Sequence, residues 1–178
     1  AWVPEYLSRA ASFSLADIGR YGWIPFFANG AGIVAGGMFS DRLCRHGTPV
    51  IRARMTSMLA GVILMTAGVL AAYPIHIAAS IAVISVAAFG FGLWAPNMMS
   101  LCADGFPSHL VGSVTGLTGV GAGVGGMVFT LSTGWMLDHF GYAPVFLAAG
   151  LSPLLAYATL HVLLGADGLP LARDRARR

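Results

Sequence analysis

The chain has 178 residues, of which 57% are hydrophobic and only 10% are charged, and lysine does not occur in it. A soluble domain carries roughly a quarter charged residues, so this composition excludes an ordinary water-soluble domain and indicates a polytopic membrane protein. The pI near 9.2 does not point to a nucleic-acid partner, because the arginines gather in two segments whose positions membrane topology explains.

Long uncharged stretches separate the charged positions. The longest covers 49 residues between Arg54 and Asp104, which suits two membrane crossings of about 20 residues each and divides naturally at Tyr73-Pro74. Helices are expected, because an open sheet would leave backbone hydrogen-bonding groups unsatisfied in lipid. The sequence therefore predicts an all-α membrane protein whose bundle, residues 21–165, has five full transmembrane helices at 21–39, 55–73, 77–101, 110–135 and 142–164.

The two ends of the chain are expected to differ in kind. Residues 1–20 are interpreted as the end of a truncated helix followed by an external loop, and residues 166–178 as a basic tail. Four arginines lie in the segment 36–54 and four more in the tail. Because short arginine-rich loops stay on the cytoplasmic side, the sequence predicts a multi-pass protein of the cell (inner) membrane with a cytoplasmic C-terminus.

The first expected span carries Asn29 near its middle. An amide at that depth either bonds to a neighbouring helix or contacts a substrate, and bonding between helices is the commoner case.

The segment GGMFSDRLCRHG, residues 36–47, places an acid beside arginines at the end of this span. It resembles the G-x-x-x-D-R-x-G-R-type loop of the major facilitator superfamily, which occurs once in each six-helix half. The matching positions are Gly37, Asp41, Arg42, Arg45 and Gly47, while Cys44 replaces the second glycine. The resemblance implies a conformational role in which the aspartate faces a helix N-terminus of the opposite half, where the helix dipole favours an anion. A solvated loop that only sets topology is the alternative.

The third expected span contains FGFGLWAPNMMS, residues 89–100. Pro96 is expected to bend the helix next to Trp94 and Asn97, which offer an indole donor and an amide. Bent helices with exposed polar groups recur at transporter binding sites. Asn29, Trp94 and Asn97 are therefore the candidate substrate-binding residues, with packing as the alternative for the tryptophan.

The fourth expected span is rich in glycines at small-xxx-small spacing, which permits close backbone contact between helices. The predicted helix-packing residues are Gly112, Gly116, Gly119, Gly121, Gly123 and Gly125. The run GVGAGVGG superficially resembles a phosphate-binding loop, but no Lys-Ser/Thr follows it and it lies within a span, which excludes that interpretation.

Two further segments, FPSHLVGSVTGL (106–117) and GGMVFTLSTGWMLDHFGYAPVF (125–146), narrow the resemblance. They resemble the anion:cation symporter family within the superfamily, and its hexuronate-transporter branch in particular. The related aldonate carriers have an asparagine in the glycine stretch, where this chain has Val120, Gly121 and Ala122. The resemblance runs over essentially residues 1–165 and implies the second, C-terminal half of a twelve-helix carrier.

The function implied by this resemblance is secondary active transport of a small organic anion, with a hexuronate or related sugar acid as the leading expectation. Alternating access would be driven by a proton, or by sodium. The implied partners are the substrate anion, the coupling ion, the missing N-terminal half of the same carrier and the lipid bilayer. None of the five expected spans contains Asp, Glu, Lys or Arg, and the resemblance implies that the charged substrate and proton sites belong to that other half.

There are three alternatives to an organic-anion carrier. A carrier of another substrate class and a non-transporting membrane sensor stay open as alternatives. An intramembrane enzyme is least favoured, because the histidines are scattered, no H-E-x-x-H motif occurs, and no nucleophile stands with a base at membrane depth. No catalytic residue, metal site or cofactor is therefore expected.

Overall fold

The computed structural model describes residues 20–72 and 77–164, and these ranges are helical almost throughout. Their elements are α3 (Ile24–Arg45), α4 (Val50–Thr66), the 3₁₀ helix η1 (Ala67–Ala72), α5 (Ile77–Gly105), α6 (Ser108–Phe140) and α7 (Tyr142–Leu164). The expected all-α class is confirmed for this part of the chain. The predicted external segment and basic tail lie outside the described residues, except for Arg20 at the edge.

Most helix ends differ from those expected from charge. Whereas α7 covers the same residues as the fifth expected span, α3, α5 and α6 extend into polar segments, and α4 begins at Val50 and becomes a 3₁₀ helix from Ala67. The helices stop at backbone signals instead. Pro49 and Pro107 precede α4 and α6, and Gly141, with φ of 76°, follows α6. Charged residues indicate where a segment leaves the hydrocarbon of the membrane, whereas glycine and proline determine where the helix itself begins or ends.

Four helical stretches in the described ranges are long and apolar enough to cross a membrane. They are Val50–Leu70, Ala78–Gly105, Ser108–Phe140 and Tyr142–Leu164. The remaining expected crossing, the first at 21–39, corresponds to α3, whose glycines, Asn29 and charged last turns lower its mean hydropathy. Five full crossings therefore stay a prediction.

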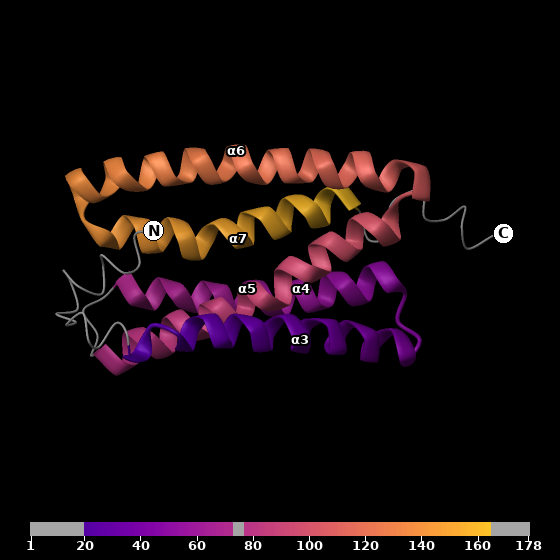
Figure 1. Ribbon diagram of the computed structural model, residues 1–178, viewed down its shortest axis with the longest axis horizontal. Coiled ribbons are helices and arrows are strands. Elements are labelled where there is room, and N and C mark those ends of the chain that lie inside the picture. The colour runs from indigo at the N-terminus through magenta and orange to yellow at the C-terminus, as the bar shows by residue number, and fades with distance from the viewer. Residues whose placement is uncertain (1–19, 73–76, 165–178) are drawn as a thin grey trace.

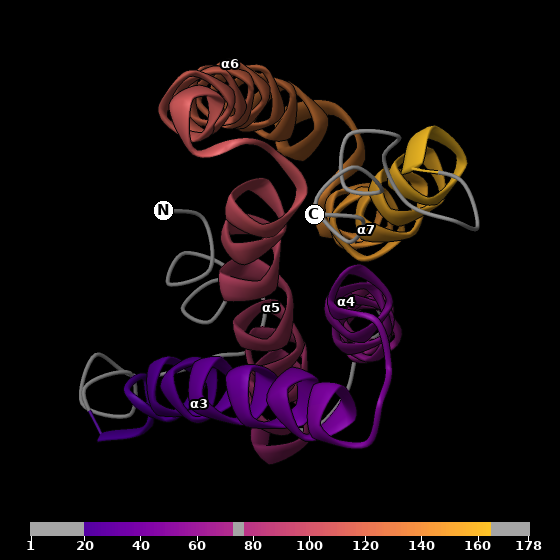
Figure 2. The same ribbon diagram turned by 90° about the vertical axis from the view of Figure 1, so that its right-hand side faces the viewer.

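The helix α5 lies at the centre of the arrangement and packs most extensively against α3 and α4 (Figures 1 and 2). On the other side, α7 packs on α4 and η1, and α6 lies against α5 and α7. Only Thr133 is buried among the 33 residues of α6. The packed core of this chain is therefore the group α3, α4, α5 and α7, while most of α6 presents an open surface.

Close approach of α3 and α5 depends on two glycines one helical turn apart. A Cβ at Gly36 would lie 2.9 Å from the Cα of Leu93, and one at Gly32 would overlap the carbonyl group of Phe89. Such small-xxx-small pairs let helix backbones meet. The pair Gly32 and Gly36 therefore brings the backbones of α3 and α5 together.

A second close approach joins α4 and α5, where a Cβ at Gly61 would lie 2.6 Å from the carbonyl oxygen of Gly90. The packing role expected for the glycines of α6 stays a prediction. Among the described residues, no heavy atom lies within 4 Å of a Cβ built at Gly37, Gly112, Gly116, Gly119, Gly121, Gly123 or Gly125. Spacing identifies a helix face that can pack closely but not the helix that packs on it, and the α6 glycines have no such neighbour among residues 20–72 and 77–164.

Candidate functional site

The most connected polar group of the described chain is the guanidinium of Arg54, whose side chain is 18% exposed. It lies in the second turn of α4, and Asp104 lies at the end of α5. Since α4 and α5 form the two arms of a hairpin, the start of one arm meets the end of the other. Arg54 Nε donates to Asp104 Oδ2 at 3.2 Å, so a cation at a helix start, where the dipole disfavours it, gains an anionic partner.

The same guanidinium reaches α3. Arg54 Nη1 donates to Ser40 Oγ at 2.7 Å and lies 3.6 Å from Asp41 Oδ1. Asp41 is 62% exposed and Asp104 only 34%. Water screens an exposed ion pair, so Asp104 is the stronger electrostatic partner, while Ser40 supplies the short hydrogen bond.

Asn97 extends these contacts into the interface between the helices, and only 1% of its surface is exposed. Its Nδ2 donates to Ser57 Oγ at 3.0 Å and to the Leu93 carbonyl at 2.8 Å, and its Oδ1 accepts a long bond of 3.5 Å from Arg54. Ser57 Oγ in turn donates to the carbonyl of Gly36 at 3.2 Å. We call these connected side chains the Arg54 network: Ser40, Asp41, Arg54, Ser57, Asn97 and Asp104.

The Arg54 network links the adjoining ends of α3, α4 and α5. A buried charge is tolerated only where partners satisfy it, and the cluster meets that requirement from three helices. The loop motif predicted a role for Asp41 but did not indicate that Arg54 pairs with Asp104. Their positions in the sequence could have indicated this pairing. Arg54 and Asp104 lie at the two ends of the 49-residue uncharged stretch, and a helical hairpin brings both ends to the same side of the membrane.

Trp94 and Asn97 stand three residues apart on α5 but serve different interfaces. The indole of Trp94 meets the ring of Tyr157 on α7 edge to face, with centroids 6.4 Å apart. It packs against a cluster of Met55, Met58 and Leu101. Pro96 lies between them within a single continuous helix.

Asn29 on α3 differs from Asn97 in its hydrogen bonding. Its Oδ1 is buried and has no hydrogen-bond partner among the described residues. Such an orphaned acceptor is costly, so it marks a place where a donor is needed. The structure gives no contact that unites Asn29, Trp94 and Asn97 in one cluster; Asn97 faces α3 and α4, and Trp94 faces α7.

The loop after α3 closes with a Schellman turn. Gly47 N–H donates to the Cys44 carbonyl at 3.0 Å, and Thr48 N–H donates to the Leu43 carbonyl at 3.1 Å. Gly47 has φ of 89°, a left-handed conformation that glycine adopts without a Cβ penalty. The final glycine of the predicted motif thus has a definite backbone role, whereas a Cβ built at Gly37 would meet no heavy atom of the described residues within 4 Å.

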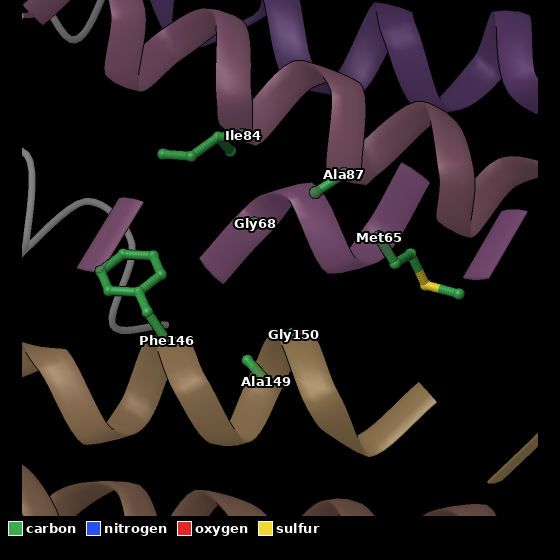
Figure 3. Close-up of a pocket in the computed structure, with 7 residues that line it drawn as sticks. All are labelled: Met65, Gly68, Ile84, Ala87, Phe146, Ala149 and Gly150. Carbon is green, nitrogen blue, oxygen red and sulfur yellow. The ribbon is translucent and has the colours of Figure 1, made fainter. Parts of the chain in front are cut away.

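An apolar cavity of about 190 Å³ lies between α4, η1, α5 and α7 (Figure 3). Its lining consists of Met65, Gly68, Ile84, Ala87, Phe146, Ala149 and Gly150. Recognition of a carboxylate needs donors or a cation, and this lining supplies no polar side chain. This cavity is therefore unsuited to a small hydrophilic anion.

Comparison with known proteins identifies the family of this chain. The model of the Major Facilitator Superfamily matches residues 1–176. Similar curated proteins include a D-galactonate transporter of Escherichia coli O6:H1 (26% identical) and the hexuronate transporter of E. coli K12 (24%), each matched over 92% of this chain and 38% of the relative. A probable galactarate/D-glucarate transporter of E. coli K12 is 29% identical over 92% of this chain and 37% of its own length.

The alignments cover the C-terminal part of these relatives, so this chain spans well under half of their length. The family is one of transporters and not of enzymes. With its long apolar helices and a match along nearly its whole length, the chain belongs to the Major Facilitator Superfamily.

Proposed function

We propose that the protein containing this chain is a secondary active transporter of small organic anions, with a hexuronate or a related sugar acid as substrate. It moves the anion together with a proton by alternating access, and this chain supplies the second six-helix half. The observation that carries the proposal is similarity over 92% of the chain to transporters named for galactonate, hexuronates and galactarate/glucarate.

The distribution of charge supports a division of labour between two halves. Between Arg54 and Asp104, and between Asp104 and Asp138, the sequence has no Asp, Glu, Lys or Arg. A carboxylate that leaves water needs a cationic partner, so the arginine or lysine that binds it, and the acid that carries the proton, belong to the first half. This half contributes neutral contacts.

The structure supports the three candidate contacts unequally. Asn29 has a buried acceptor with no partner among the described side chains, which suits a substrate hydroxyl. Trp94 offers an indole edge but packs on Tyr157. Asn97 is committed to Ser57, Leu93 and Arg54, so a substrate contact there requires those bonds to rearrange.

Two features of this chain suit a mechanism in which the two halves of a carrier rock against each other. The Arg54 network holds α3, α4 and α5 together, so these helices move as one body. The exposed glycine face of α6, from Gly112 to Gly125, offers a smooth surface on which the first half packs. Asp41 is exposed beside Arg54, which suits a contact with a helix N-terminus of that half.

The proposal is tested by uptake of labelled galacturonate, glucuronate and galactonate into proteoliposomes that contain the complete protein. An inward proton gradient should drive accumulation, and a protonophore should abolish it. Sodium dependence without proton dependence would overturn the coupling ion. Binding of a sugar acid without any uptake would indicate a sensor instead of a carrier.

Asn29 and Asn97 provide a matched pair of variants for the substrate site. Asn29→Ala should raise the KM for uptake by about fivefold to thirtyfold, the equivalent of one buried hydrogen bond of about 1–2 kcal/mol, with normal amounts of folded protein. Asn97→Ala should lower the stability of the protein, because it leaves Ser57 and Arg54 with fewer partners. An unchanged KM in Asn29→Ala would remove Asn29 from the substrate site.

A further inference from the structure

Two buried oxygen atoms, one on α3 and one on α5, have no hydrogen-bond partner among the described residues. They are Oδ1 of Asn29 and Oγ of Ser85. Both atoms are covered by this chain itself, so a segment outside the chain does not reach them in this conformation. A buried acceptor without a bond is costly, whereas a serine hydroxyl can donate as well as accept. Ser85 therefore carries the kind of donor that the Asn29 oxygen lacks.

The packing of α3 on α5 sets the two side chains on facing helix surfaces. The helices run in the same direction (Figure 1), and a Cβ at Gly32 would overlap the carbonyl group of Phe89. Asn29 lies three residues before Gly32, on the same face of α3. Ser85 lies four residues before Phe89, on the same face of α5. Each side chain therefore stands one turn before this contact, at about the same level of the interface.

The hydroxyl of Ser85 differs from other hydroxyls in these helices. Those of Thr66 and Thr133 donate to the carbonyl four residues earlier in their own helix, a local bond that is common for threonine and serine. Ser85 has no such bond within the described residues, so its hydrogen is free to bond across the interface. A serine and an asparagine already pair between α4 and α5, where Asn97 Nδ2 donates to Ser57 Oγ at 3.0 Å.

We propose that Ser85 is a positioning residue for Asn29, and that its hydroxyl donates to Asn29 Oδ1 and fixes the plane of the amide. Rotation of the Ser85 side chain between staggered positions aims the hydroxyl at α3. A carbonyl oxygen has two lone pairs, so the same oxygen accepts a second bond from a hydroxyl of the sugar acid. An amide that is ordered before the substrate arrives costs less to bind. This inference rests on the proposed function, in which Asn29 contacts the substrate.

The first test measures uptake by the complete protein in proteoliposomes, with whichever of galacturonate, glucuronate and galactonate the unsubstituted protein accumulates. Ser85→Ala should raise the KM by about fivefold, the effect of losing one ordinary hydrogen bond, and should leave kcat unchanged. Ser85→Thr keeps the hydroxyl and should restore the KM of the unsubstituted protein.

The matched control is Ser80→Ala, which should leave the KM unchanged. Ser80 is a serine of the same helix whose buried Oγ also has no partner among the described residues. It precedes Ile84 and Ala87 by one and two turns on a different face of α5, and those two residues line the apolar cavity beside α7.

A double-variant cycle separates positioning from a general structural role. Adding Ser85→Ala to Asn29→Ala should raise the KM no further, because the amide that Ser85 orients is already gone. The same variants are compared by denaturant unfolding in detergent, which needs no substrate. The loss of stability in the double variant should be smaller than the sum of the two single losses.

The outcomes distinguish this inference from the proposed function. An unchanged KM in Ser85→Ala, an equal rise in Ser80→Ala, or additive effects of Ser85→Ala and Asn29→Ala on the KM would overturn the positioning role. Additive losses of stability would overturn the hydrogen bond itself. No uptake of any sugar acid by the unsubstituted protein would contradict the proposed function, while the unfolding cycle would still decide whether the bond forms.

Discussion

Two neighbouring glycines on α3 give the sharpest test of the packing described above. Gly36 faces α5, where a Cβ would lie 2.9 Å from Leu93 Cα and 3.2 Å from Asn97 Nδ2. At Gly37 no heavy atom of the described chain lies within 4 Å of an added Cβ. The substitutions Gly36→Ala and Gly37→Ala therefore make the same chemical change in the same helix but in different surroundings.

The magnitudes follow from two opposing terms. Alanine favours the helix over glycine by about 1 kcal/mol at either position. At Gly36 the new methyl group approaches a backbone carbon well inside the usual 3.5–4.0 Å contact, and shifting the helices to relieve such overpacking costs about 1–3 kcal/mol. Gly37→Ala should thus stabilise the protein by up to about 1 kcal/mol, while Gly36→Ala should be less stable than Gly37→Ala by about 1–3 kcal/mol.

The assay is denaturant unfolding of the purified protein in detergent, with each variant compared with the unsubstituted protein. The difference between the two variants matters more than either value alone, because it cancels the common gain in helix propensity. Equal stability of Gly36→Ala and Gly37→Ala would refute the close α3–α5 contact.

Two more predictions use the same unfolding assay. Arg54→Met should destabilise the protein by about 1.5–3 kcal/mol, because it removes charge-assisted bonds to Asp104 and Ser40. The control is Arg20→Gln, which changes an exposed arginine and should alter stability by no more than about 0.5 kcal/mol. A loss of stability in Arg54→Met within about 0.5 kcal/mol of that in the control would contradict the network. Gly47→Ala should cost about 1–2 kcal/mol, since its φ is 89°, and Gly47→Asn should cost less because asparagine tolerates that conformation. Equal losses in the two Gly47 variants would argue against the Schellman turn.

Secondary structure was largely predictable from the sequence, because length and lack of charge dominate in lipid. The 49-residue uncharged stretch had to divide into two helices, and α4 and α5 follow that division. The ends of α3 and α4 were harder to predict. Helical hydrogen bonding continues past Phe39 into a charged segment, and only the turn at Gly47 and Pro49 stops it.

Contacts between helices were less predictable than the helices themselves. Glycine spacing alone favoured α6, yet Gly32, Gly36 and Gly61 make the close contacts. A row of glycines on one helix does not specify which helix packs against it, because that depends on the tertiary arrangement of the helices. For the same reason Asn97 could be identified as a polar residue within a span, but not as the partner of Ser57 and Arg54.

The loop motif shows what a resemblance adds and where it stops. It drew attention to Asp41 and Gly47, and the structure gives each a definite place: an ion pair with Arg54 for the first and a left-handed turn for the second. It did not indicate that Ser40 takes the shortest bond from Arg54, at 2.7 Å. That bond depends on the relative placement of α3 and α4, which no local pattern specifies.

Proton-coupled transport of a sugar acid is the central claim, and it is tested most directly by recording the external pH of de-energised cells that express the complete protein. Addition of galacturonate should make the medium transiently more alkaline, because protons enter with the anion. A protonophore should abolish the response. No alkalinisation with galacturonate, glucuronate or galactonate, when the protein is shown to be in the membrane, would contradict the claim.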